Sequence, residues 1–122
     1  MQILEPLKRG DTLITPTFTL INGWVASNFT GGIWFTVRDT LAPADDVTDS
    51  GAIGQVSVAG GGIVFSSTTE GVVTIAASVT TEWTPGNKYW DLQGVITGPP
   101  QRVHTLASGR ILVASDITRR TS

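Results

Sequence analysis

Polar and apolar residues alternate along most of this chain, and glycine, proline and asparagine interrupt the alternation at short intervals. In residues 12–21, Ile14, Pro16, Phe18 and Leu20 fall on one side and threonines on the other. Such alternation predicts a half-buried β-strand, because successive side chains of a strand point to opposite faces. Since Pro16 has no backbone N–H, we expect this strand to lie at a sheet edge or to break at a bulge.

A second alternating strand, rich in aromatic residues, follows the turn at Pro85-Gly86. We expect Trp90 and Leu92 to face inward, with Tyr89 and Asp91 on the opposite face. A buried tryptophan removes a large apolar area from water, so this strand is predicted to form the centre of the core.

Shorter segments predict the remaining strands. In residues 33–38, Ile33, Phe35 and Val37 are predicted to point inward and Trp34 outward. Asn22-Gly23 predicts a hairpin with a return strand over residues 24–26, since both residues tolerate positive φ. The other predicted elements are strands at 52–59 (Val56 and Val58 inward), at 72–80 (Val73, Ile75, Ala77 and Val79 inward), and at 102–107 and 110–118, separated by a turn at Ser108-Gly109, with an acidic loop at 39–51 and a helical turn at 81–84.

These elements predict one all-β domain over residues 1–122, because no segment shows a 3.6-residue period. Strands with turn signals between them suggest an antiparallel sandwich or barrel of about 7–9 strands, and the longer connections favour the sandwich. Residues 119–122 are expected to form a frayed tail. The predicted core consists of Phe18, Phe35, Val73, Ile75, Trp90, Leu92 and Val113.

Composition narrows the functional classes. The net charge is −2 and charged residues make up 15% of the chain, which argues against nucleic-acid or membrane-surface binding. Cysteine is absent, so disulfides and cysteine nucleophiles are excluded. We expect no signal peptide, because the N-terminus turns polar within a few residues, and no apolar run approaches the length of a membrane span.

Catalytic or metal-binding chemistry finds little support. His104 is the single histidine, so a histidine-based triad or metal site has at most one member here, and we expect an ordinary strand-face residue. We therefore predict neither an enzyme nor a cofactor, a metal or a small-molecule substrate. The acidic residues weighed for calcium ligation or glycoside hydrolysis, without a supporting spacing, are Asp45, Asp46, Asp49, Glu70, Glu82 and Asp91.

Two tryptophans raise a sharper question. Trp34 alternates with the inward Phe35, and Trp24 follows the predicted hairpin tip. Outward tryptophans on a lightly charged domain indicate a protein interface, so Trp24 and Trp34 are our interface candidates. The alternative is a carbohydrate-binding module, which requires co-planar rings with polar groups around them.

Several short motifs resemble one known family. They comprise Lys8-Arg9-Gly10-Asp11-Thr12, Ile33-Trp34-Phe35-Thr36-Val37-Arg38, Gly61-Gly62-Ile63, Gly71-Val72-Val73-Thr74-Ile75, Pro85-Gly86, Tyr89-Trp90-Asp91-Leu92-Gln93, Thr105-Leu106-Ala107-Ser108-Gly109 and Val113-Ala114-Ser115-Asp116-Ile117-Thr118-Arg119. In this order they look like the small immunoglobulin-like domains of tailed-phage tail, baseplate and neck proteins, including the N-terminal domain of the upper baseplate protein. Lys88 departs from the pattern, since an aromatic residue is common there.

The resemblance implies an immunoglobulin-like β-sandwich that is a non-enzymatic structural part of a phage or prophage virion. Its partners would be other virion proteins, with a homo-oligomer as a further expectation. The virion component would be made in the cytoplasm of the bacterial host. The resemblance brings no catalytic residues with it.

Overall fold

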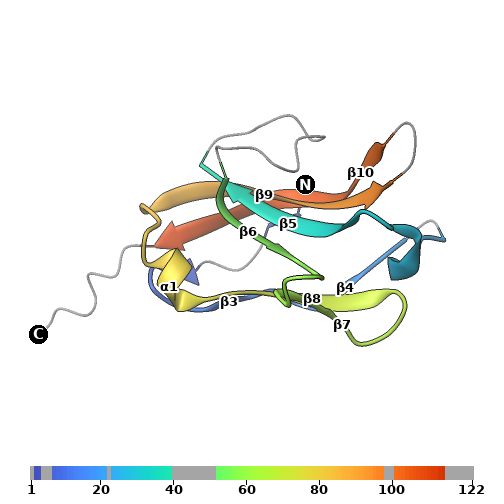
Figure 1. The fold of residues 1–122 in the computed structure, drawn as a ribbon. Coiled ribbons are helices and arrows are strands. Elements are labelled where there is room, and N and C mark those ends of the chain that lie inside the picture. The colour runs from blue at the N-terminus through green and yellow to red at the C-terminus, as the bar shows by residue number, and fades with distance from the viewer. Residues whose placement is uncertain (1, 4–6, 22, 40–51, 98–100, 115–122) are drawn as a thin grey trace, which may run out of the picture.

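The computed structural model describes residues 2–3, 7–21, 23–39, 52–97 and 101–114. The described residues form two facing β-sheets with little helix, so the predicted all-β class is confirmed (Figure 1). The strands are β1 (Gln2–Ile3), β2 (Leu7–Lys8), β3 (Leu13–Ile14), β4 (Phe18–Thr19), β5 (Gly32–Arg38), β6 (Ala52–Ser57), β7 (Ile63–Phe65), β8 (Glu70–Ile75), β9 (Gly86–Ile96) and β10 (Arg102–Ala114), and the helical turns are η1 (Ala26–Asn28) and α1 (Ala77–Thr80).

The larger sheet is mixed rather than purely antiparallel. Its order is β1–β10–β9–β5–β6, with β2 also on β10. β1 and β2 run parallel to β10, which corrects the antiparallel prediction, whereas β10, β9, β5 and β6 pair antiparallel. The smaller sheet consists of β3 and β4 on one edge of β8 and β7 on the other.

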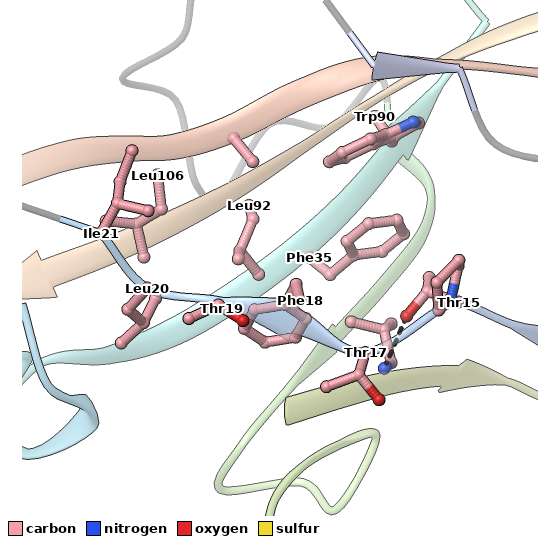
Figure 2. A pocket seen from close by; sticks show the side chains of 13 residues that line it. Thr15, Thr17, Phe18, Thr19, Leu20, Ile21, Phe35, Trp90, Leu92 and Leu106 are labelled. Carbon is pink, nitrogen blue, oxygen red and sulfur yellow. Dashed lines mark hydrogen bonds between the residues drawn. The ribbon is translucent and has the colours of Figure 1, made fainter. Parts of the chain in front are cut away.

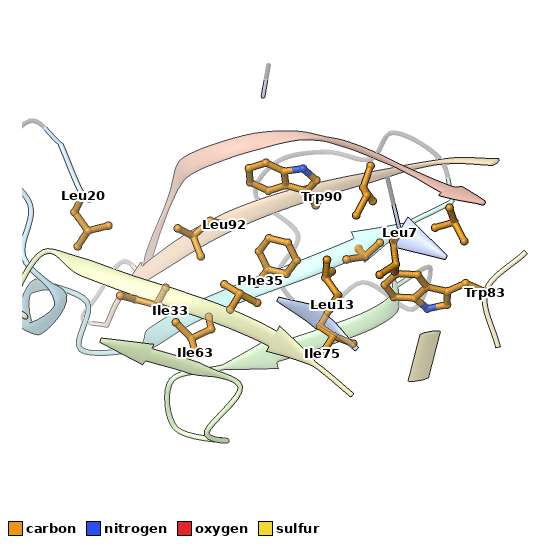
Figure 3. Packing of buried hydrophobic residues seen from close by; sticks show 14 of the residues in the cluster. Leu7, Leu13, Leu20, Ile33, Phe35, Ile63, Ile75, Trp83, Trp90 and Leu92 are labelled. Atoms are coloured by element: carbon orange, nitrogen blue, oxygen red, sulfur yellow. The ribbon is translucent and has the colours of Figure 1, made fainter. Parts of the chain in front are cut away.

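The core lies between the sheets, and Figure 3 shows its packing. Phe35 from β5 stacks on Trp90 from β9, with ring centroids 5.3 Å apart. Trp83, to which the sequence analysis gave no role, follows α1 in the chain, is buried, and donates from Nε1 to the carbonyl oxygen of Ile53 over 3.0 Å. Of the expected core residues, Phe18 is half-buried, and the buried ones are Phe35, Val73, Ile75, Trp90, Leu92 and Val113.

The predicted strand at 12–21 is interrupted. β3 and β4 both pair with β8, but their registers differ by one residue. Leu13 lies opposite Ile75 and Phe18 lies opposite Gly71, so the chain advances five residues on this edge and four in β8. One extra residue reverses the side-chain alternation, as in a β-bulge. Ile14, predicted inward, is therefore 63% exposed. The break surrounds Pro16, as that residue's missing N–H predicted.

Three predictions about β6, β8 and β10 were also wrong. The strand predicted at 72–80 ends at Ile75, and the helical turn α1 takes the place of its last residues. The Thr80 hydroxyl holds α1 in place by donating a hydrogen bond of 2.6 Å to the carbonyl oxygen of Asp11. Ser108-Gly109 makes no turn, because β10 is continuous and Gly109 lies opposite Trp90. Val58 lies beyond β6 and is 40% exposed, rather than on the core side.

The connection after β4 is a turn but not a hairpin. The Trp24 N–H bonds the carbonyl of Ile21, and Gly23 has φ of 81°. η1 replaces the predicted return strand at 24–26 and leads to β5 in the other sheet. Asn22 and most of the predicted acidic loop lie outside the described residues.

Candidate functional site

The outer face of the larger sheet carries a row of polar side chains opposite one another on β5 and β9. Trp34 pairs with Gln93, and Thr36 pairs with Asp91. Thr36 and Gln93 are both fully buried although they point away from the core between the sheets. This face is therefore packed, unlike the solvated outer face that is usual for an antiparallel sheet.

An ion pair holds part of this row together. Arg38 Nη1 lies 2.9 Å from Asp91 Oδ2, and the two side chains are 4% and 11% exposed. Burial raises the pKa of Asp91 above its ordinary value of 3.8, while the charge and the hydrogen bond of Arg38 oppose that rise. Asp91 Oδ1 has no hydrogen-bond partner among the described residues, so the carboxylate is only half satisfied. The pair fixes β5 against β9, which is a structural task.

Gln93 is the least satisfied group of this face. Neither its side-chain oxygen nor its side-chain nitrogen has a hydrogen-bond partner among the described residues. Most buried polar groups are bonded, so an amide left in this way is unusual. It lies beside Trp34, the predicted interface residue, in the register of β5 and β9.

Trp34 points outward, as predicted, and is half-buried. A Cβ added at Gly32 would lie 3.3 Å from Trp34 Nε1, so the indole lies close to the backbone of that glycine. Gly32 also has φ of 105°, a conformation that favours glycine. Gly32 thus allows the indole to approach the start of β5.

Trp24 lies on the other side of the same sheet. Its ring centroid is 4.9 Å from that of Phe29 and 5.1 Å from that of His104. Phe29 covers Gly94, where an added Cβ would come within 2.4 Å of its ring. Trp24 and Trp34 therefore cannot form one stacking platform for a sugar chain. Sugar binding through Trp34 alone stays a prediction, as does the interface role of both residues.

A cavity of about 280 Å³ lies between the two sheets, and Figure 2 shows the side chains around it. Phe35, Trp90 and Leu92 form its aromatic and aliphatic part, contributed by β5 and β9. The opposite wall is the interrupted edge of the smaller sheet. The lining residues are Thr15, Pro16, Thr17, Phe18, Thr19, Leu20, Ile21, Phe35, Val73, Trp90, Leu92, Leu106 and Ala107.

The sequence analysis missed this cavity. The available signal was Pro16, because a broken edge strand cannot close over the core as a continuous strand does. A bulge between Thr105 and Ala107 then places the consecutive residues Leu106 and Ala107 on the cavity. Bulges cannot be recognised in one sequence from its alternation.

The titratable residues of the described chain are dispersed. Lys88 is 3% exposed and bonds Asp39 and Thr84, which accounts for a lysine in a mostly buried strand. Among the described residues, no group of three or more histidine or acidic side chains could hold a metal ion. Asp45, Asp46 and Asp49 lie outside the described residues.

No protein-family model matches this chain, and no curated protein is found to be related to it. No helix among the described residues is long and apolar enough to cross a membrane.

Proposed function

We propose that this chain is an immunoglobulin-like domain that serves as a non-enzymatic structural subunit of a phage or prophage virion. It would act in the tail, baseplate or neck through contacts with other virion proteins. The order of the strands supports the immunoglobulin-like part of this proposal, and the virion role rests on the family that the sequence motifs resemble.

The strand order supports an immunoglobulin-like topology. In that fold one sheet contains strands B, E and D, and the other contains C, F and G, with C′ added in some members. Here β3 with β4, β8 and β7 form a sheet in the order B–E–D, whereas β10, β9, β5 and β6 form one in the order G–F–C–C′. The first strands pair with the last strand instead of with B, which distinguishes this domain from the constant-type arrangement.

The outer face of the larger sheet supports a role in protein binding. It presents Trp34 beside a buried amide without a partner, and tryptophan is enriched at the energetic centres of interfaces. A subunit packed against the exposed part of Trp34 would cover the indole. This surface is the one we assign to assembly.

Fractionation of particles tests the virion proposal. Particles from an induced culture of the source bacterium would be purified on a density gradient, and their proteins identified by mass spectrometry. We expect the chain in stoichiometric amounts in the particle fraction. Its consistent absence from intact particles would contradict the proposal.

A matched pair of variants tests the surface. Trp34→Ala should reduce incorporation into particles while leaving the melting temperature nearly unchanged, because Trp34 is half-buried on an outer face. Val64→Ala is the control, since Val64 is 63% exposed and belongs to the smaller sheet. Equal losses of incorporation in both variants would show that Trp34 has no special role.

A further inference from the structure

The short strands β1 and β2 lie beside β10 and run in the same direction as it does. β1 pairs with Gly109 and Arg110, and β2 pairs with Val113 and Ala114. We propose that β1 and β2 form a mechanical clamp on β10, through which the domain resists tension that enters the chain at β1 and leaves it at β10. The proposal does not depend on the virion assignment.

The first argument is the direction in which such tension acts. Gln2 lies opposite Gly109, five residues before Ala114 in the sequence. Along β10 this is roughly 17 Å, whereas paired strands lie only about 4.8 Å apart sideways. Pulling residues 2 and 114 apart therefore slides β1 and β2 lengthwise against β10.

A lengthwise slide is the direction in which paired strands resist most. The hydrogen bonds run across the strands, so a slide stretches all of them at once, whereas a sideways pull breaks them one after another. In an antiparallel pair, the entering and leaving residues would lie at the same end, and the strands would be peeled apart. The parallel pairing is thus what places the bonds of β1 and β2 under a common load.

The second argument is the attachment of β2. Leu7 is 8% exposed and belongs to the core cluster, so β2 cannot slide without drawing this side chain out of the core. The Arg9 N–H continues the pairing by donating to the carbonyl oxygen of Ala114 over 3.0 Å. Beyond that turn, the Thr80 hydroxyl donates to the carbonyl oxygen of Asp11 over 2.6 Å. These contacts hold the end of the clamp to both sheets.

The third argument identifies the step that limits unfolding under tension. β10 has eleven residue pairs with β9, but two with β1 and two with β2. Since β10 lies between them, the same pull acts on both sides, and the side with fewer pairs yields first. Detachment of β1 and β2 is therefore the barrier, and β3 to β9 are still folded when it is crossed.

Two pulling directions provide the test. Cysteine is absent from the chain, so force handles can be attached to introduced cysteines in the full chain. Gln2→Cys with Ala114→Cys pulls the strands lengthwise, and Gln2→Cys with Arg110→Cys pulls them sideways, because Arg110 lies opposite Ile3. Ala114 and Arg110 are both exposed, so both handles leave the core intact. In optical tweezers, we expect the lengthwise pair to unfold at a force at least about twofold higher, because several bonds yield together.

A matched pair of variants separates the clamp from general stability. Leu7→Ala in β2 and Leu13→Ala in β3 each truncate a buried leucine and should both lower the equilibrium stability. Only Leu7 leaves its site at the barrier. With lengthwise handles, Leu7→Ala should raise the unfolding rate at a given force at least about tenfold, and Leu13→Ala should change it less than about twofold.

Two controls complete the comparison. Chemical denaturation measures the equilibrium loss of each variant, and dividing the change in the logarithm of the unfolding rate by that loss corrects for unequal losses. Leu7→Val and Leu13→Val are smaller truncations that replace the pair if an alanine variant does not fold.

Three results would overturn the proposal. The first is an equal unfolding force in the two pulling directions, which would show that the parallel pairing gives no special resistance. The second is an equal corrected rise of the unfolding rate in the Leu7 and Leu13 variants, which would place the barrier in the core as a whole. The third is a rise confined to the Leu13 variant, which would place it in the smaller sheet.

Discussion

The central strand β9 and the edge formed by β3 and β4 show two ways in which one alternating pattern is used. β9 has eleven residues and is bonded to β10 on one side and to β5 on the other. β3 and β4 have two residues each and are bonded only to β8 among the described strands. The strands on both sides of β9 fix which of its side chains point inward, whereas at the edge the inward and outward positions are exchanged around Pro16.

The difference also decides where polar groups are tolerated. Both faces of β9 are packed, so Asp91 and Gln93 are buried opposite the apolar Trp90 and Leu92. At the edge, a side chain replaces part of the ladder: the Thr15 hydroxyl accepts a hydrogen bond of 3.0 Å from the Val73 N–H. The central strand is thus stabilised by packing, and the edge by a few local bonds beside a cavity.

The largest expected effect is the truncation of Trp90 in the centre. Trp90→Ala should lower the free energy of unfolding by about 3–5 kcal/mol, as large aromatic truncations in cores do. Phe18→Ala at the edge should cost less than about 2 kcal/mol, because Phe18 is half-buried and already borders a cavity. Urea denaturation of both variants measures the difference, and equal losses would contradict the contrast between centre and edge.

Adding a methyl group to a glycine should also destabilise the central strand more than the edge, with a smaller difference than the aromatic truncations give. Gly94→Ala in β9 should cost up to about 3 kcal/mol, because its Cβ would come within 2.4 Å of the enclosed Phe29 ring. Gly71→Ala in β8 should cost less, since its shortest contact would be the tip of the Phe18 ring at 2.9 Å, and that ring borders free space; the backbone oxygen of Val64, at 3.1 Å, would have to shift only by a few tenths of an ångström. Thermal unfolding of both variants provides the comparison; a larger loss for Gly71→Ala would reverse it.

The sequence predicted the central strands better than the edge. The faces of β5 and β9 were predicted correctly, with Phe35, Trp90 and Leu92 inward and Trp34 outward. Strict alternation is reliable there because ladders on both sides prevent a slip of register. Ile14 was misplaced, because the position of a bulge depends on the partner strand and not on the alternation itself.

The candidate surfaces were predictable only in part. Trp34 could be placed on an outer face from alternation. The position of the Trp24 ring instead depends on contacts with Phe29 and His104, and these two residues lie far from each other in the chain. The cavity requires the combined effect of Pro16, the bulge beside Leu106 and the facing of two sheets. Such a feature arises from tertiary packing, and no single segment encodes it.

The hydroxyl of Thr15 allows the edge to be tested without a change of shape. Thr15→Val should lower the free energy of unfolding by about 1–2 kcal/mol, because the buried Val73 N–H loses its acceptor. Thr17→Val makes the same change at an exposed position and should have almost no effect. Chemical denaturation measures both, and a loss confined to Thr17→Val would show that the edge is not held by this bond.

The smallest expected effect is a dependence on pH from Asp91 in the central strand. Burial raises its pKa in the folded protein above the ordinary 3.8, so the folded state holds the proton more tightly than the unfolded state. The contribution of Asp91 to stability is therefore fully present below pH 3.8 and is lost as the pH rises through the raised pKa. Denaturation of the wild type and of Asp91→Asn from pH 3 to pH 7 isolates this contribution, since the other acidic groups are common to both.

We expect the stability of the wild type relative to Asp91→Asn to fall as the pH rises over that window. Arg38 opposes the fall, because its charge favours the ionised carboxylate 2.9 Å away. The same comparison in an Arg38→Met background should therefore give a steeper fall, since burial then acts without the opposing charge. A relative stability that rises with pH in the wild type would mean that the attraction of Arg38 exceeds the effect of burial, and that the central strand is held by its ion pair as well as by its packing.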